Sequence, residues 1–386
     1  MNLISAWFRR HFSDPQVVIL AILLIIGSVV IIILGDMLAP VLASVVIAYL
    51  LQGLVGGMER RRIPRLVAVL LVFLTFMMFL LFLLLRLLPL LWQQVEQLVQ
   101  ELPSMISWVQ QELLRLPERY PGFISEQQVM DLIHVLRSEL TGLGQRVLSI
   151  SIASVGALIW ILVYIFLVPL LVFFLLKDKE RLVQWLTSFL PEDRSLASEV
   201  WQDVDRQIGN YVRGKFWEIL IVWVASYVTF AILGLQFAML VSFFVGLSVL
   251  IPYIGATVMA LPVASIAYFQ WGWSSDFAYA VVAYVIIQLL DGNVLVTLLF
   301  SEVVNLHPVA IIVAVLVFGG TFGFWGVFFA IPLATLVQAI LKAWFKRNHK
   351  EEKIQETAQD RPDISKGTMI KGLESEAFEP DQGVSP

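Results

Sequence analysis

Asp291 is the residue whose surroundings point most directly to chemistry. It lies within an apolar segment, about Phe277–Phe300, close to Gln288, Gly292 and Asn293. An aspartate at the centre of a membrane-spanning helix costs about 2.5–3.5 kcal/mol, and such residues usually face a cavity or a partner. The Asp-Gly-Asn run should also loosen the helix and free backbone carbonyls. We favour a substrate, proton or cation site; the alternative is a helix break whose neighbouring polar groups satisfy it.

A second group of polar residues, Glu302, Asn305 and His307, follows this segment. A carboxylate and an imidazole five residues apart could carry protons, because histidine titrates near neutral pH. The simpler interpretation, which we favour, is that these side chains are solvated at the inner face of the membrane. The candidate residues of a substrate or ion pathway are therefore Asp291, Asn293, Gln288, Glu302 and His307.

Motifs that carry enzymatic chemistry are absent from the sequence. Glu302 and His307 do not form a His-Glu-x-x-His zinc site, and there is no Gly-x-x-x-x-Gly-Lys-Ser/Thr loop for ATP. The chain has no cysteine, which excludes thiolate metal sites and cysteine nucleophiles. No basic, aromatic-interleaved surface indicates nucleic acid. We therefore predict no enzyme, no metal, no cofactor and no nucleic-acid partner.

The composition indicates a membrane protein. Of the 386 residues, 59% are hydrophobic and only 15% are charged, and the mean hydropathy is +0.84. Soluble globular proteins average about 45–50% apolar and about 25% charged residues. The net charge of −4 is too small to indicate a charged partner. The predicted fold is an all-α polytopic membrane protein surrounded by lipid.

Six apolar stretches are typical of full spans, and two more form broken hairpins, so about eight transmembrane helices are expected. A turn at Gly35-Asp36 should separate the first two spans. Arginines dominate the loop Glu59–Arg65, which places it in the cytoplasm by the positive-inside rule and puts both termini there. The full spans are about Val17–Leu34, Met37–Gly56, Leu66–Leu88, Ile150–Leu176, Phe216–Leu233 and Phe277–Phe300.

Other segments are predicted to lie outside the bilayer. Residues 91–148 place apolar side chains at three- and four-residue steps, which indicates an external helical hairpin. This hairpin suits self-association or gating; packing on the membrane surface or on its own core is an equal alternative. A helix beginning at Pro191 should lie on the inner membrane face and lead into the fifth span, where Glu218 should reach the headgroups.

The chain therefore divides into five predicted regions. The charged and aperiodic composition of the last region predicts disorder. The regions are 1–90, N-terminal membrane helices; 91–148, the external hairpin; 149–215, the fourth span and an inner amphipathic helix; 216–345, the transport core; and 346–386, a cytoplasmic tail.

The transport core contains one pattern twice, between Gly234 and Leu341. When the two copies are aligned, Tyr253 meets Phe324 and Gly255 meets Gly326; after one skipped residue, Pro262 meets Pro332. Each copy is an apolar hairpin interrupted by glycine or proline, which is how transporters build binding sites at membrane depth. An accidental match between apolar sequences is the alternative. The predicted breaks are Pro252, Tyr253, Gly255, Gly319, Gly320, Gly323, Gly326 and Pro332.

The two copies should be oppositely oriented in the membrane. Each unit, Phe216–Phe269 and Phe277–Leu341, combines one span with one hairpin. The number of crossings per unit is odd whether the hairpin arms cross fully or turn back. The second unit is therefore inverted relative to the first, and re-entrant or fully spanning arms both remain open.

Several short blocks of this region resemble a known family. They are Tyr211 to Glu218, Ile251-Pro252-Tyr253-Ile254-Gly255, Asp291-Gly292-Asn293, Leu306-His307-Pro308 and Gly323 to Ala334. In this order they are similar to the autoinducer-2 exporter family, and within it to the PerM-type permeases, over about Val17 to Phe345. The resemblance implies a homo-oligomeric bacterial inner-membrane protein of about eight helices. Its proposed cargoes include autoinducer-2, and other relatives are described as sodium/proton antiporters.

The residues and the resemblance together predict a secondary permease or exporter of a small polar molecule, with or without coupling of its transport to an ion. Asp291 and the two broken hairpins would form the pathway. One alternative is a monovalent cation/proton antiporter that uses Asp291 and His307. Another is a membrane scaffold without transport activity, whose outer hairpin and inner helix recruit partners.

Overall fold

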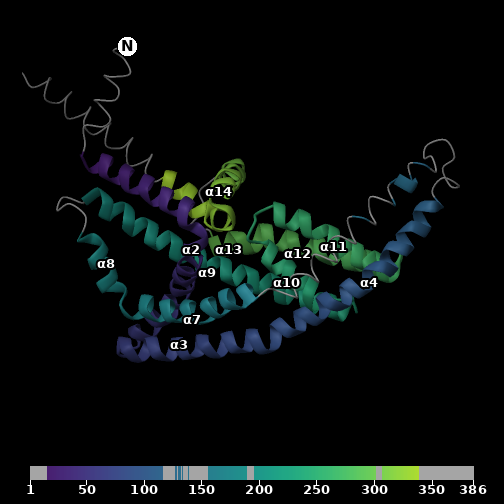
Figure 1. The fold of residues 1–386 in the computed structure, drawn as a ribbon, viewed down its shortest axis with the longest axis horizontal. Coiled ribbons are helices and arrows are strands. Elements are labelled where there is room, and N and C mark those ends of the chain that lie inside the picture. The colour runs from purple at the N-terminus through teal and green to yellow at the C-terminus, as the bar shows by residue number, and fades with distance from the viewer. Residues whose placement is uncertain are drawn as a thin grey trace, which may run out of the picture. The chain divides into compact units, whose positions relative to one another are not determined.

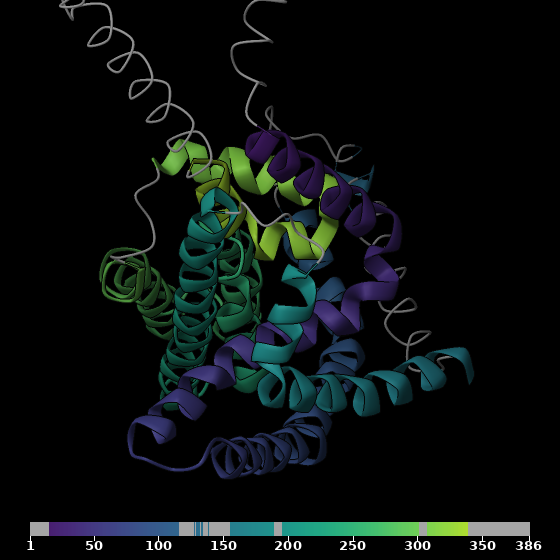
Figure 2. The same cartoon turned by 90° about the vertical axis from the view of Figure 1, so that its left-hand side faces the viewer.

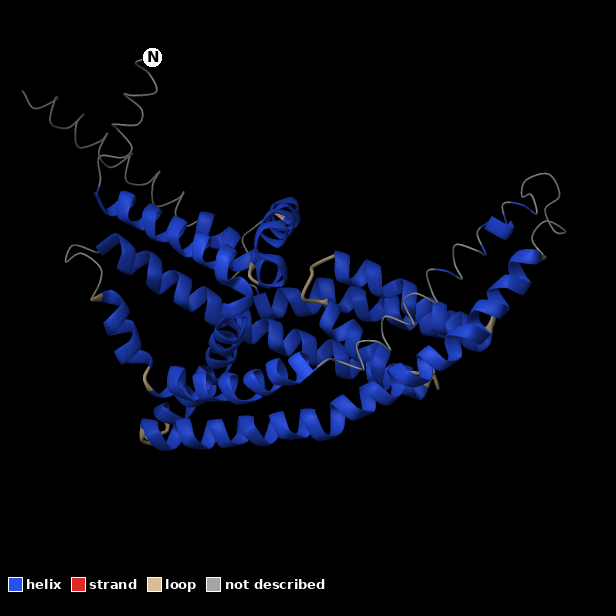
Figure 3. Ribbon diagram, viewed as in Figure 1, coloured by secondary structure: helices blue, strands red, loops and turns tan. Residues whose placement is uncertain are grey.

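The computed structural model describes residues 15–115, 155–188, 195–300 and 307–338, with a few single positions between 127 and 138. The described residues form helices and no strands, which confirms the all-α prediction (Figure 3). Six described helices are long and apolar enough to cross a membrane, and the bent pair α7–α8 would be a seventh. Residues up to Ala334 form one compact unit, and the following description concerns that unit.

The first helix, α2 (Pro15–Arg60), is continuous, so the predicted turn at Gly35-Asp36 is wrong. A single glycine among apolar residues weakens a helix without ending it. Instead the helix changes direction along its length (Figure 2). Pro40 lies within it and cannot donate the helical hydrogen bond, which is the common cause of such a bend.

The third predicted span and the first external helix form one continuous rod. It consists of α3 (Arg65–Phe82), the π-helical turn η1 (Leu83–Leu87) and α4 (Leu88–Leu114). The 47 residues from Arg65 to Gln111 would extend about 70 Å, which exceeds a bilayer core of about 30 Å. Part of this length must therefore lie outside a bilayer core. Most of the second helix of the external hairpin, and residues 346–386, lie outside the described residues.

Three further helices precede the transport core in the chain. The fourth span is α7 (Val155–Lys177), and the short helix α8 (Lys179–Thr187) follows it after a bend of 83°. The predicted inner helix and the fifth span form the single helix α9 (Ser195–Ile232), without an interruption at Arg213-Gly214-Lys215. α9 contacts α2 and, in the following core, α10, α12, η2 and α13. It is thus the axis on which the broken hairpins are assembled.

The first broken hairpin has the predicted break. Its arms are α10 (Ala238–Ser248) and α11 (Ile254–Trp271), and Tyr253 between them has a positive φ of 63°. At the base, the Gln270 amide accepts a hydrogen bond from the Gln236 N–H (2.7 Å) and donates one to the Gly234 carbonyl (2.8 Å). α10 begins and α11 ends at this base, and the 11 residues of α10 are fewer than the about 20 that cross a bilayer core.

The sixth span then leads to the second hairpin. It is built from α12 (Ser275–Leu290), the π-helical turn η2 (Asp291–Leu295) and α13 (Val296–Phe300). α12 packs on α11 and α9 (Figure 1). The second hairpin begins with α14 (Pro308–Phe328), whose helical geometry is interrupted at Gly323, with φ 60° and ψ −138°. A short helix begins at Ala330, after Phe329, and continues to the end of this unit.

The repeat that aligned Gly255 with Gly326 has a physical basis in the two hairpin tips. A methyl group added to Gly255 would lie 1.8 Å from the Ser248 carbonyl oxygen. One added to Gly326 would lie 1.8 Å from the Phe318 carbonyl oxygen. Each glycine therefore lets the returning arm touch the backbone of the outgoing arm, and no other residue type fits there. The spacing is one residue longer in the second tip.

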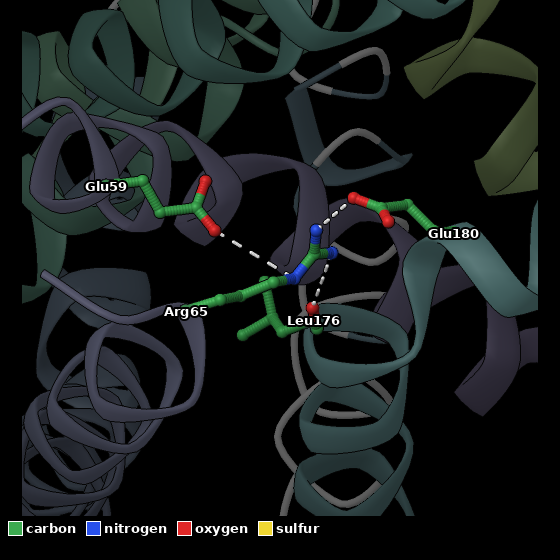
Figure 4. A network of polar contacts seen from close by, with 4 residues as sticks. All are labelled: Glu59, Arg65, Leu176 and Glu180. Carbon is green, nitrogen blue, oxygen red and sulfur yellow. Dashed lines mark hydrogen bonds and ion pairs between the residues drawn. The ribbon is translucent and has the colours of Figure 1, made fainter. Parts of the chain in front are cut away.

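A network of polar contacts joins the arginine loop, Glu59–Arg65, to the bend between α7 and α8 (Figure 4). The Arg65 guanidinium is ion-paired with Glu180, lies 3.9 Å from a Glu59 oxygen and donates to the Leu176 carbonyl at 3.4 Å. Leu176 is at the carboxyl end of α7, where a cation complements the helix dipole. The network thus fixes the direction in which α8 leaves the membrane span.

Replacing Arg65 with lysine is expected to lower stability by less than about 1 kcal/mol, despite the number of contacts. The Glu180 side chain is 76% exposed, so water and salt screen the pair. The measurement is the thermal unfolding midpoint in detergent, with Arg61→Lys as the control in the same loop. A loss above about 2 kcal/mol would show that this network stabilises the fold far more than an exposed ion pair does.

Candidate functional site

Asp291 is buried inside the sixth span, as its sequence setting suggested. It is the first residue of η2, so the Asp-Gly-Asn run loosens the helix into a π turn without breaking it. Such turns often mark functional positions in helices. The side chain is only 8% exposed, and its Oδ1 has no hydrogen-bond partner within the described residues. A buried carboxylate oxygen without a partner is costly, so Asp291 is a candidate for binding a proton, a cation or a cargo group.

The neighbouring helix α9 supplies a buried ion pair that the sequence analysis missed. The Lys215 ammonium donates to the Glu218 carboxylate at 2.7 Å, and the two residues are 4% and 2% exposed. The expectation that Glu218 reaches the headgroups is therefore wrong. Its side chain points into the protein because α9 packs on η2 and α13 along this face. The signal in the sequence was a lysine and a glutamate three residues apart inside a span, the spacing of neighbours on a helix face.

Asp291 lies within electrostatic range of both members of this pair. We call Lys215, Glu218 and Asp291 the charged cluster. Two carboxylates and one ammonium leave one negative charge unbalanced when all three groups are ionised. The Lys215 ammonium also lies 5.5 Å from the centre of the Phe300 ring, a cation–π distance. The arrangement can accept one proton or one monovalent cation without leaving a net buried charge.

The other predicted pathway residues have different surroundings. Gln288, one helical turn before Asp291, has a buried Nε2 without a partner in the described part of the chain. Asn293 is exposed, and its amide donates to the Leu289 carbonyl of its own helix. His307 is exposed and caps α14, because its Nδ1 accepts a hydrogen bond from the Val309 N–H. Glu302 and Asn305 lie outside the described residues.

The two hairpin tips meet in an apolar region. Ile251 of the first tip packs against the cluster of Ala314, Val315 and Ala330 in the second hairpin. Beside this contact is a cavity of about 420 Å³. Its single polar side chain, Ser248, already donates its hydroxyl to the Val245 carbonyl. The cavity lining is Phe244, Leu247, Ser248, Leu250, Ile251, Ile254, Gly255, Val258, Met259, Phe324, Val327 and Phe328.

Comparison with known proteins matches this architecture to one family. The family model described as "AI-2E family transporter" matches residues 19–346. The chain belongs to this family. PerM of Escherichia coli strain K12, which is named as a permease, is 42% identical over 344 residues, 89% of this chain and 98% of that protein. YueF of Bacillus subtilis strain 168, named as a transport protein, is 26% identical over 87% of this chain and 93% of its own length.

Membership confirms the resemblance carried by the short motif blocks. It also establishes the coarse class of the protein, because the family and these relatives are named as transporters or permeases. The chain is accordingly a multi-pass membrane protein of a bacterial permease family. The broken hairpins and the charged cluster both lie within the matched residues.

Proposed function

We propose that this protein is a secondary permease of the bacterial inner membrane, exporting a small polar molecule, with autoinducer-2 as the cargo that the family resemblance suggests. The observation that carries the proposal is the buried Asp291 carboxylate near the Lys215–Glu218 pair, whose Oδ1 has no hydrogen-bond partner among the described residues. Ionisable side chains inside spans are expensive and usually belong to substrate or ion pathways. Interrupted helices from two repeats that meet near the middle of the membrane are a usual way to build a transporter site with alternating access.

Three features of this proposal come from the sequence and the family. Both termini would be cytoplasmic, because the arginine loop Glu59–Arg65 follows the positive-inside rule. The protein would act as a homo-oligomer. Gln288, a pathway residue in the sequence prediction, would face the same pathway as Asp291; its buried Nε2 lies one helical turn away and has no hydrogen-bond partner within the described part of the chain.

The test of this proposal is flux through the purified protein in liposomes, with Asp291→Asn as the variant. The amide keeps the shape of the side chain and removes its charge. We expect a fall in flux of about tenfold or more, because the variant leaves the Lys215–Glu218 pair neutral and unable to respond to a proton or cation. Val294→Ala, at an exposed position in the same π turn, is the control. Unchanged flux in Asp291→Asn would remove Asp291 from the mechanism.

A monovalent cation/proton antiporter is the second candidate, and the single unbalanced charge of the cluster favours it. Proton movement into liposomes in response to an imposed sodium or potassium gradient would support this function. His307 would contribute if His307→Gln changed that movement, although its side chain caps a helix. Proton movement that is independent of every cation and absent without cargo would favour the permease.

A further inference from the structure

We propose that Tyr211 and Tyr284 are positioning residues that latch the two broken hairpins closed, each acting from the leading span of the opposite repeat. This inference rests on the proposed function, in which the hairpins open and close during transport. It assigns the closing contacts to two hydroxyl groups, each of which binds a backbone carbonyl at a hairpin tip.

The Tyr211 latch is explained by a proline in the second hairpin. In an α-helix the carbonyl of residue 328 would accept from the N–H of residue 332, but that residue is Pro332 and has no N–H. The Tyr211 hydroxyl donates to the Phe328 carbonyl at 2.9 Å instead. Tyr211 is 1% exposed, and its ring contacts Phe300 and Phe328. The hydrogen bond therefore satisfies a carbonyl that the helix itself leaves without a donor.

The Tyr284 latch holds the first hairpin in a comparable way. The Tyr284 hydroxyl donates to the carbonyl of Ala256, near the start of α11 and directly after the break. Tyr284 is buried in the same apolar cluster as Val245 and Val249 of the first hairpin. Tyrosine hydroxyls that are buried usually have such a partner, so the contact fixes α12 against the returning arm.

The two contacts are reciprocal between the repeats. Tyr211 lies in α9, which leads into the first hairpin, and holds the second. Tyr284 lies in α12, which leads toward the second hairpin, and holds the first. The sequence predicts that the two repeats are inverted, and in that orientation the latches face opposite sides of the membrane. With both hydrogen bonds made, the space between the tips is the apolar cavity, which contains no free polar group for a hydrated cargo.

The side that each latch controls follows from its neighbours. Tyr211 is six residues from Asp205, which accepts a hydrogen bond from Tyr49 and lies 3.6 Å from the Lys179 ammonium at the start of α8. α8 in turn is joined to the arginine loop through Glu180 and Arg65. Releasing Tyr211 should therefore open the cavity toward the face that bears the arginine loop, which the positive-inside rule places in the cytoplasm. Releasing Tyr284 should open it toward the other face.

Thiol labelling tests the proposal without knowledge of the cargo. The chain has no cysteine, so a single cysteine introduced as Met259→Cys or Val327→Cys reports on the cavity alone. Labelling by a membrane-impermeant thiol reagent is measured in intact cells and in inside-out vesicles. The test variants are Tyr211→Phe and Tyr284→Phe. The controls are Tyr227→Phe in α9 and Tyr279→Phe in α12, two exposed tyrosines on the same helices.

We expect each test variant to raise the labelling rate about threefold. One interhelical hydrogen bond in a membrane changes an equilibrium constant by about that factor, here the constant between the closed and open hairpin. Tyr211→Phe should act in inside-out vesicles and Tyr284→Phe in intact cells, while the controls match the parent. Pro332→Ala supplies the missing N–H to Phe328 and should mimic Tyr211→Phe, with little further change when the two are combined. Labelling unchanged in both tyrosine variants, or raised from the same side in both, would overturn the proposal.

Flux separates this inference from the proposed function. Altered labelling without flux of any cargo tested would support the latches and contradict the permease. Flux that depends on Asp291 together with unchanged labelling would support the permease and contradict the latches. A Tyr→Phe variant that fails to fold is replaced by Pro332→Ala for the second hairpin, since this substitution weakens the same contact without altering α9.

Discussion

Replacing Lys215 with methionine is expected to lower the stability of this protein by about 3–5 kcal/mol, enough to abolish most of the folded protein in the membrane. The substitution keeps the length of the side chain and removes the only cation that contacts Glu218 within the described residues. Glu218 and Asp291 then remain as two buried carboxylates in electrostatic range of each other. Removing one partner of a buried ion pair costs more than the pair contributes, because an uncompensated charge stays behind.

The measurement is the thermal unfolding midpoint in detergent together with the amount of protein that folds. The double variant Lys215→Met/Glu218→Gln should recover much of the loss, because it removes both charges of the pair. Lys177→Met, an exposed lysine at the end of α7, is the control and should have little effect. If Lys215→Met were as stable as the parent, the charged cluster would be solvated and its role in transport would have to be abandoned.

Gly255→Ala is expected to have the second-largest effect, with a loss of about 3 kcal/mol or more, at the upper end for an overpacked site. The added methyl group would lie 1.8 Å from the Ser248 carbonyl oxygen and 2.6 Å from its carbon. Backbone atoms cannot move aside as a flexible side chain can, so the two arms of the first hairpin must separate. Gly326→Ala should act in the same way on the second hairpin, where the Phe318 carbonyl is the obstacle.

Gly320→Ala is the matched control, since a methyl group there meets no atom within 4 Å. Alanine at that helical position should be neutral or slightly stabilising, because it has the higher helix propensity. Unfolding midpoints of the three variants are compared in detergent. Equal stability of Gly255→Ala and Gly320→Ala would mean that the hairpin tip does not hold the close approach seen in the structure.

These two results bear on one question, whether the transport core is a tightly constrained assembly. The hairpin tips depend on glycine because backbone touches backbone, and the charged cluster depends on Lys215 because the membrane offers no water to carboxylates. Such packed elements switch between discrete arrangements instead of deforming gradually. A permease built in this way needs contacts that are weak enough to break during transport. The single hydrogen bonds from the tyrosine hydroxyls to the Phe328 and Ala256 carbonyls are weak enough.

The sequence was sufficient to predict the membrane class, the family resemblance and the interruptions at Tyr253 and Gly323, whereas the predicted breaks at Gly319 and Gly320 are wrong because both residues continue helix α14. Proline and glycine act through the backbone, so the interruptions that follow Pro252 and that occur at Gly323 have a local cause. The loosened helix at Asp291 could be predicted for the same reason, because Gly292 and Asn293 follow it directly. The repeat could be detected from the sequence alone, because both hairpin tips use glycine for the same close contact with a backbone carbonyl.

Other features depended on which helices pack together. The sequence could not show that Gly35-Asp36 continues a helix, because a turn and a bent helix have similar local signals. It placed Glu218 at the headgroups, since burial of an ion pair depends on η2 and α13 covering that face of α9. The latches joining Tyr211 to Phe328 and Tyr284 to Ala256 link residues 117 and 28 positions apart. Local composition marks the positions at which a membrane helix can be interrupted, whereas only tertiary packing determines which polar groups lose water and which partners they find.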